Sequence, residues 1–131
     1  MTGFINKLAA FTLMGLLAVL APISASHSAS SDKSPTGLEI VIFEITDCSH
    51  CDYFRNRVAR IYQKTEYAER APLRVVDLDT QGTHGYPLGS EITTAPTIVV
   101  FHKGREVQRF GGAMARDRFF SFVEYLLNIY G

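Results

Sequence analysis

The sequence predicts a mixed α/β fold, and three observations lead to this prediction. An apolar run at Leu38 to Ile45 is typical of a strand that is covered on both faces of a sheet. A helical segment and a second strand follow it, which predicts a parallel pair. Two further strands joined by a tight turn predict an antiparallel pair, and a final helix closes the chain. The sheet should therefore be four-stranded and mixed, with helices on both faces.

The first helix is predicted from Cys48 to about Tyr67. Apolar side chains fall at helical spacing and define its buried face, namely Cys51, Phe54, Val58 and Ile61. Basic side chains fill much of the remaining surface, which we interpret as a solvated face: Arg55, Arg57, Arg60 and Lys64.

The second half of the chain alternates strands with turn signals. Pro72 marks a break, and residues 73–78 (LRVVDL) are typical of a strand. Residues 79–92 contain three glycines and one proline, so a short helix or loop is expected. Strands at 97–102 and 106–110 are joined by a hairpin turn at Lys103-Gly104, and helical spacing returns from Phe119 to Tyr130.

The N-terminus has the pattern of a secretory signal peptide. Lys7 is followed by an uncharged apolar run from Leu8 to Leu20, then Pro22 and small residues. We expect cleavage after Ala25, a flexible linker at residues 26–37 and one folded domain at residues 38–131. An uncleaved membrane anchor is the alternative, although thirteen apolar residues are few for a transmembrane helix.

The composition excludes several classes of protein. Thirteen basic and thirteen acidic residues give a formal charge of zero, which argues against nucleic-acid binding. Hydrophobic residues make up 47% of the chain and charged residues 20%, as in globular proteins. With only two cysteines, the chain cannot be a disulfide-rich scaffold or hold zinc with four cysteines.

Those two cysteines form the motif Cys48-Ser49-His50-Cys51 at the predicted start of the first helix. A helix N-terminus presents unpaired N–H groups and a partial positive charge, which stabilise a thiolate. We therefore predict that Cys48 is the nucleophile of disulfide exchange and that the more buried Cys51 is the resolving thiol. A protonated His50 would favour the thiolate further.

Other interpretations of the motif stay open at this stage. A structural disulfide is one, although so small a loop removes little entropy from the unfolded chain. A copper or zinc site using the cysteines with His50, His84 or His102 is another, although the histidines are scattered. An adhesion or scaffold domain with incidental cysteines is a third.

Together with Thr94-Ala95-Pro96-Thr97 before the third strand, the motif resembles the thioredoxin superfamily over nearly all of residues 38–131. The resemblance implies a thioredoxin fold with a redox-active disulfide and no other cofactor. It also implies that Pro96 is a cis-proline against the cysteines and that the Ala95 backbone binds an extended substrate. An ordinary proline at the start of a strand is the alternative.

A closer resemblance is to the periplasmic SoxS-type thioredoxins of sulfur-oxidation (Sox) systems. It is carried by VIFEITDCSHC (41–51), PLRVVDLD (72–79), APTIVVFHKGREVQRFGG (95–112) and RFF (118–120). It implies reduction of a disulfide or blocked cysteine on a periplasmic partner, notably a sulfur-carrier protein. A membrane dithiol relay would supply the electrons, and we expect a monomer.

The sequence also departs from ordinary thioredoxins. Asp47 precedes the first cysteine in place of Trp, and Ile42 replaces a buried Asp. Glu44 is then the nearby acid available for proton transfer to or from Cys51, unless it is a surface carboxylate. A His before the second cysteine also resembles disulfide-forming enzymes, so an oxidant or isomerase is the alternative to a reductase.

Overall fold

A computed structural model describes residues 34–131, and the predicted signal peptide at residues 1–25 lies outside them. The four strands are β1 (Leu38–Glu44), β2 (Leu73–Asp77), β3 (Thr97–His102) and β4 (Arg105–Gly111). The helical segments are α1 (Ser49–Phe54), the π-helix η2 (Arg55–Ala59), α2 (Arg60–Tyr62), α3 (Tyr67–Arg70), α4 (Leu78–Gln81) and α5 (Arg116–Tyr130).

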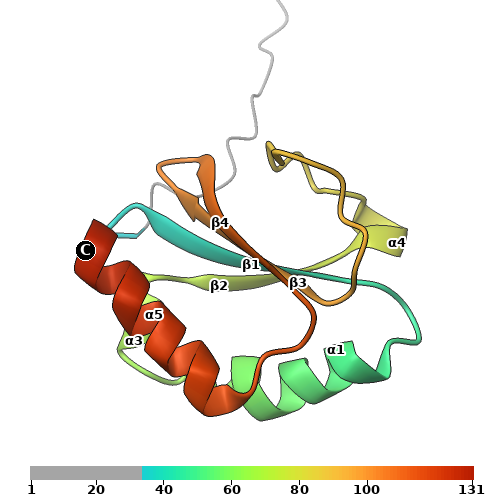
Figure 1. The fold of residues 1–131 in the computed structure, drawn as a ribbon, viewed down its shortest axis with the longest axis horizontal. Helices are drawn as coiled ribbons and strands as arrows, with labels where there is room; N and C mark the ends of the chain where they lie inside the picture. The colour runs from blue at the N-terminus through green and yellow to red at the C-terminus, as the bar shows by residue number, and fades with distance from the viewer. Residues whose placement is uncertain (1–33) are drawn as a thin grey trace, which may run out of the picture.

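The strands form one mixed sheet in the order β2-β1-β3-β4 (Figure 1). β1 pairs in parallel with β2 and antiparallel with β3, and β3 and β4 form the predicted hairpin. Lys103 and Gly104 in the hairpin turn both have positive φ, as a tight two-residue turn requires. The four-stranded mixed sheet confirms the predicted fold class.

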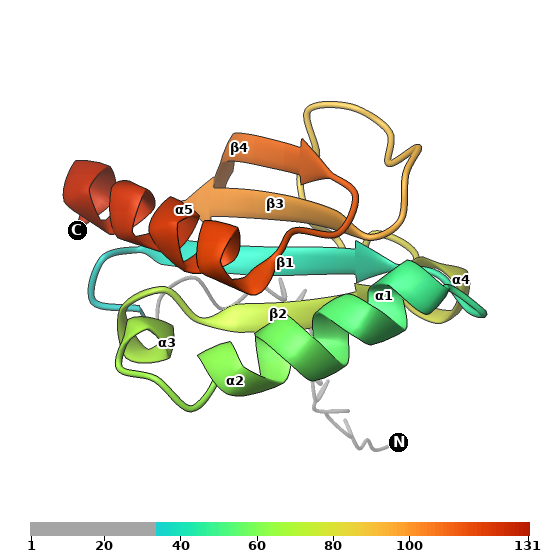
Figure 2. The same ribbon diagram turned by 60° about the horizontal axis from the view of Figure 1, so that its bottom comes forward.

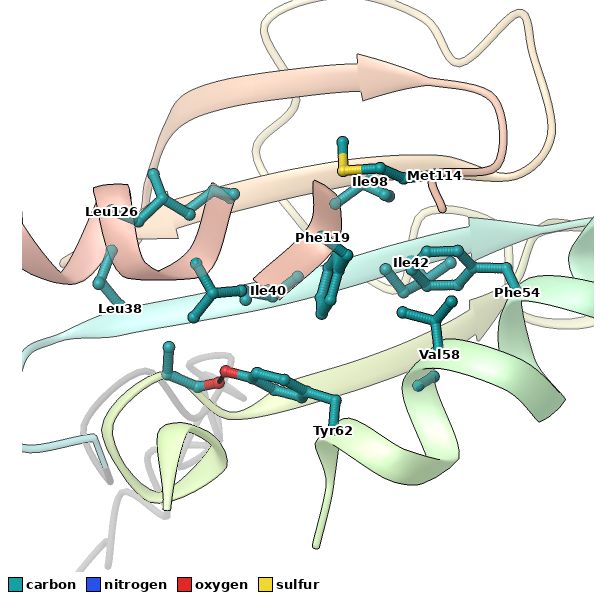
Figure 3. Packing of buried hydrophobic residues seen from close by; sticks show 14 of the residues in the cluster. Leu38, Ile40, Ile42, Phe54, Val58, Tyr62, Ile98, Met114, Phe119 and Leu126 are labelled. Carbon is teal, nitrogen blue, oxygen red and sulfur yellow. Dashed lines mark hydrogen bonds between the residues drawn. The ribbon is translucent and has the colours of Figure 1, made fainter. Parts of the chain in front are cut away.

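Alternate side chains of β1 enter two separate cores. Leu38, Ile40 and Ile42 belong to the core under α1, η2, α2 and α5 (Figure 3). Val41 and Phe43 point to the opposite face and pack with Tyr86. That second face is covered by the one-turn helix α4 and the irregular chain after it, so regular helices are concentrated on the first face (Figures 1 and 2).

The first helical region differs from the prediction in two ways. A π-turn interrupts it at Arg55–Ala59, and the helix ends at Tyr62, with α3 as a separate turn. A π-turn is wider than an α-turn and advances each residue through a smaller angle. As a result Tyr62 is fully buried, whereas Ile61, which the spacing predicted to be buried, is 41% exposed.

The residues just before β1 are fixed to the body of the domain. The hydroxyl groups of Ser34 and Thr36 both donate hydrogen bonds to the carbonyl oxygen of Arg70. The end of the predicted linker is thus anchored at α3. Within residues 34–131, no helix combines the length and apolar character needed to cross a membrane.

Candidate active site

Cys48 is the N-cap residue of α1. Its backbone is extended, with φ −105° and ψ 101°, and its Sγ atom accepts a hydrogen bond from the N–H of Cys51 at 3.2 Å. This contact directs an otherwise unpaired N–H of the first helical turn at the sulfur. The same donor and the helix dipole would stabilise a thiolate at this position after reduction.

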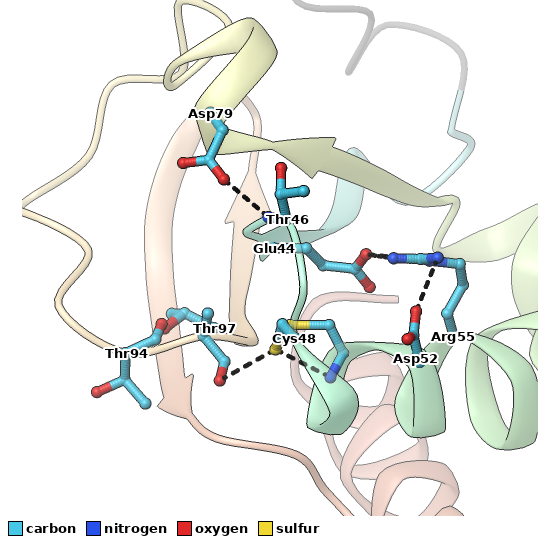
Figure 4. Close-up of a disulfide and its surroundings, with 10 residues drawn as sticks. Glu44, Thr46, Cys48, Asp52, Arg55, Asp79, Thr94 and Thr97 are labelled. Atoms are coloured by element: carbon cyan, nitrogen blue, oxygen red, sulfur yellow. Dashed lines mark hydrogen bonds and ion pairs between the residues drawn. A yellow bond between two sulfur atoms is a disulfide. The ribbon is translucent and has the colours of Figure 1, made fainter.

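The two cysteines form a disulfide and differ in exposure (Figure 4). Cys51 is fully buried beside the first core, whereas Cys48 is partly exposed. An incoming disulfide can therefore reach the sulfur of Cys48 but not that of Cys51. This asymmetry is the arrangement expected for an attacking and a resolving cysteine.

The chain before β3 lies against the disulfide. The Ala95–Pro96 peptide bond is cis, as the resemblance implies, and Pro96 is buried. The carbonyl oxygen of Ala95 is 3.8 Å from Cys48 Sγ, and Thr97 Oγ1 donates to the carbonyl oxygen of Thr94 (Figure 4). The backbone of Ala95 thus lies beside the sulfur of Cys48.

A small apolar hollow of about 130 Å³ adjoins this loop. It is lined by Ile45, Leu78, Ile92, Thr93, Thr94 and Ala95. Ile45 is 41% exposed, which is unusual for a large apolar residue directly after a buried strand. Of these lining residues the sequence analysis singled out only Ala95, because the end of β1, α4 and the loop before β3 meet only in the folded chain.

Asp79 is a second residue that the sequence analysis missed. Its Oδ2 atom accepts a hydrogen bond at 2.8 Å from the N–H of Thr46, and this hydrogen bond lowers the pKa of the carboxyl group (Figure 4). The contact ties α4 to the turn that leads from β1 into Cys48. Asp47 in that turn has φ 56°, a left-handed conformation that Asp tolerates better than most residues.

Glu44 lies at the end of β1 and is only 2% exposed, which excludes a surface carboxylate. Its Oε2 atom accepts two hydrogen bonds from the guanidinium group of Arg55, and these raise the pKa of Arg55. Arg55 also contacts the exposed Asp52. Oε1 of Glu44 is buried and has no hydrogen-bond partner among residues 34–131, and the carboxylate lies on the same side of α1 as the disulfide (Figure 4).

The three histidines of residues 34–131 do not lie close to one another. His50 and His84 are exposed, and His102 stacks on Tyr130 with ring centroids 4.7 Å apart. No group of three or more His, Cys, Asp or Glu side chains within residues 34–131 is arranged to hold a metal ion. The structure therefore brings Cys48, Cys51, Ala95 and Pro96 together, with Glu44 behind them and His50 at the surface.

The sequence model of the thioredoxin family matches residues 26–125. The chain belongs to this family, and with its Cys48–Cys51 pair it is a thiol–disulfide oxidoreductase of the thioredoxin type. Reversible formation of that disulfide carries the two electrons of such a reaction.

Solved thioredoxin structures share the fold. The periplasmic thioredoxin SoxS from Paracoccus pantotrophus is 23% identical, with a TM-score of 0.57 over 70% of this chain and 96% of that one. A Malassezia sympodialis thioredoxin is 20% identical, with a TM-score of 0.58 over 71% of this chain and 77% of its own. Oxidised Plasmodium falciparum thioredoxin is 25% identical, with a TM-score of 0.54 over 68% and 80% respectively. No curated protein sequence matches the chain.

Proposed function

We propose that this protein is a periplasmic reductase of disulfides or blocked cysteines on a partner protein, such as the sulfur-carrier protein of a Sox system. The observation that carries the reductase proposal is the asymmetric pair, an accessible Cys48 capping α1 above a buried Cys51. The signal-peptide pattern and the likeness to a periplasmic SoxS support the location and the partner.

The reaction has two steps in which atoms and electrons balance. The Cys48 thiolate attacks one sulfur of the partner disulfide, and the other partner sulfur leaves as a thiolate and takes up a proton. The Cys51 thiol then loses its proton to Oε1 of Glu44, and its thiolate attacks Cys48 Sγ. The second partner sulfur leaves as a thiolate and takes up a proton, which Glu44 can return to it through solvent. The partner has then gained two electrons and two protons, and the Cys48–Cys51 disulfide has formed.

Another dithiol must then reduce this disulfide. In an oxidising periplasm we propose a membrane dithiol relay as that donor. The same cysteines would serve a disulfide oxidant if the pair had a high reduction potential. A potential near the thioredoxin value of about −270 mV supports the reductase, and one near about −120 mV contradicts it.

Trapping tests the partner. In Cys51→Ser the mixed disulfide on Cys48 cannot be resolved, so a covalent complex with the partner should accumulate in the periplasm. A dithiol reductant should separate the two proteins by cleaving that disulfide. A Cys48→Ser/Cys51→Ser control should trap nothing. Capture of a sulfur-carrier protein supports the Sox assignment, and capture of other proteins alone contradicts it. A wild-type protein that holds stoichiometric metal and reduces no disulfide contradicts the reductase proposal.

A further inference from the structure

A groove runs between the first helical region and the start of α5, outside the site described above. It encloses about 500 Å³ and is lined by Tyr53, Arg57, Ile61, Ala115, Arg116 and Asp117. The two elements lie side by side there in both views of the ribbon (Figures 1 and 2). We call this feature the arginine groove.

The groove is a continuation of the reactive face. His50, Tyr53, Arg57 and Ile61 follow one another at intervals of three or four residues, so they form one exposed stripe along the helical axis. The stripe begins at His50, between the two cysteines. A partner whose cysteine reacts at Cys48 can therefore extend along it into the groove.

The surface of the groove is both apolar and basic. Tyr53 is 50% exposed and Ile61 41%, which is substantial exposed apolar area for one stripe. Arg57 is exposed and makes no ion pair within residues 34–131. Asp117 is the one carboxylate among the described residues that line the groove, and it is 95% exposed and paired with Arg116 at 3.5 Å.

Helix stability does not explain the arginine at the start of α5. Arg116 occupies the first turn, where the helix dipole disfavours a cation. The N-cap residue is Ala115, which provides no side-chain cap. Asp117 in the same turn suits the dipole, so Arg116 and Ala115 are the residues of the helix start that do not stabilise it.

We propose that the arginine groove binds an acidic, partly apolar segment of the partner protein while the partner's cysteine reacts at Cys48. Arg57 and Arg116 provide charge complementarity to carboxylates, since the contact of Arg116 with Asp117 is long and exposed, and Tyr53 and Ile61 provide apolar contact. This inference rests on the proposed function, since it assigns the chemistry of that partner. Surface charges of this kind mainly set the rate of encounter and choose between partners.

The test compares peptide substrates. Each peptide has one cysteine blocked by a coloured aryl thiol, with tails of Leu alternating with Asp and Glu on both sides of the cysteine. A reference peptide has Asn and Gln in place of the acids. The reduced wild-type protein should release the aryl thiol from the acidic peptide about fivefold faster at low salt. That advantage should shrink as salt screens the charges.

Arg57→Glu should abolish or reverse the advantage. Arg60→Glu is the matched control, because it makes the same charge change on the same helical segment but lines a different hollow. It should keep the advantage. If both variants lose the rate advantage of the acidic peptide equally, or if the wild type shows no such advantage, the proposed binding role of the groove is wrong.

A binding measurement separates this inference from the proposed function. The oxidised protein is titrated with a cysteine-free acidic peptide while its backbone amide signals are followed by NMR. Shifts centred on Tyr53, Arg57 and Arg116 support the groove even if no peptide is reduced. Absence of shifts there overturns it, even if disulfides are reduced at normal rates.

Discussion

Glu44 shows at the residue scale how a charged side chain is kept inside this domain. A buried carboxylate is costly unless it is paired, and Arg55 supplies the partner from the π-turn four residues after Cys51. Only Oε2 is used in this pair, so Oε1 is available to accept a proton. This free oxygen, on the same side of α1 as the disulfide (Figure 4), is the basis for the proposed role of Glu44 in the second step of the reaction.

Glu44→Gln should slow that second step. The amide keeps the size of the side chain but cannot take the Cys51 proton, and loss of a positioned base costs about 10²-fold in rate. The mixed disulfide on Cys48 should therefore accumulate in acid-quenched single-turnover experiments.

Asp52→Asn is the control for this prediction, because it also touches Arg55 but is exposed. It should resolve the mixed disulfide at the wild-type rate. If Glu44→Gln resolves it as fast as the wild type at neutral pH, Glu44 has no part in proton transfer.

At the scale of elements, the loop before β3 is held to β4 by hydrogen bonds to an ion pair within β4, between Glu106 and Arg109. Glu106 accepts hydrogen bonds from Arg109 and from the N–H of Gly89, the latter at 2.7 Å. Arg109 also donates to the carbonyl oxygens of Ser90 and Glu91, at 3.1 and 3.0 Å. The ion pair therefore fixes the segment that leads into the Ala95–Pro96 bond.

This ion pair should make the domain sensitive to acid. The hydrogen bonds from Arg109 and Gly89 lower the pKa of Glu106 in the folded protein. A lowered pKa means that the stability it contributes is present above the unfolded value of about 4.3 and is lost as pH falls through the folded value. Glu106→Gln should therefore be less stable than wild type at pH 7, with the difference shrinking towards pH 3.

Urea unfolding at both pH values measures this effect. Glu91→Gln is the control, because the Glu91 side chain is exposed and only its backbone carbonyl takes part in the contact. Its stability should parallel that of wild type at both pH values. A constant deficit of Glu106→Gln from pH 7 to pH 3 would contradict the assignment.

At the scale of the whole molecule, Phe119 joins the helices that cover the first face of the sheet. Its ring contacts Phe54 and Tyr62 edge-on, with centroids 5.4 and 5.2 Å apart, and it is fully buried (Figure 3). The first helical region and α5 thus share one packing centre against the sheet. Small domains have free energies of unfolding of about 5–15 kcal/mol, so one such residue contributes a large share of the stability.

Phe119→Ala should cost about 3–5 kcal/mol, because it removes the ring and leaves a cavity between the helices. The urea midpoint should fall, and the population of unfolded chains should rise. Phe119→Leu fills most of the space and should lose far less. If the alanine variant is as stable as the wild type, the packing of α5 against α1 through Phe119 does not stabilise the fold.

Much of this protein is predictable from the sequence, because the signals are local. Three patterns each predict the local structure at their own place in the chain: the apolar run of β1, the turn at Lys103-Gly104 and the two cysteines one helical turn apart. They are enough to predict the mixed sheet, the order of its strands along the chain and the reactive pair. The roles of Cys48 and Cys51 follow from their order at the start of a helix.

Contacts between distant segments are decided only by the tertiary structure. The π-turn shifts the buried face from Ile61 to Tyr62, and no local sequence pattern predicted this π-turn. Glu44 is equally compatible with a surface or a buried position until Arg55 is folded against it. The hollow beside Ala95 and the arginine groove likewise combine segments far apart in sequence, because packing depends on which surfaces the sheet brings together.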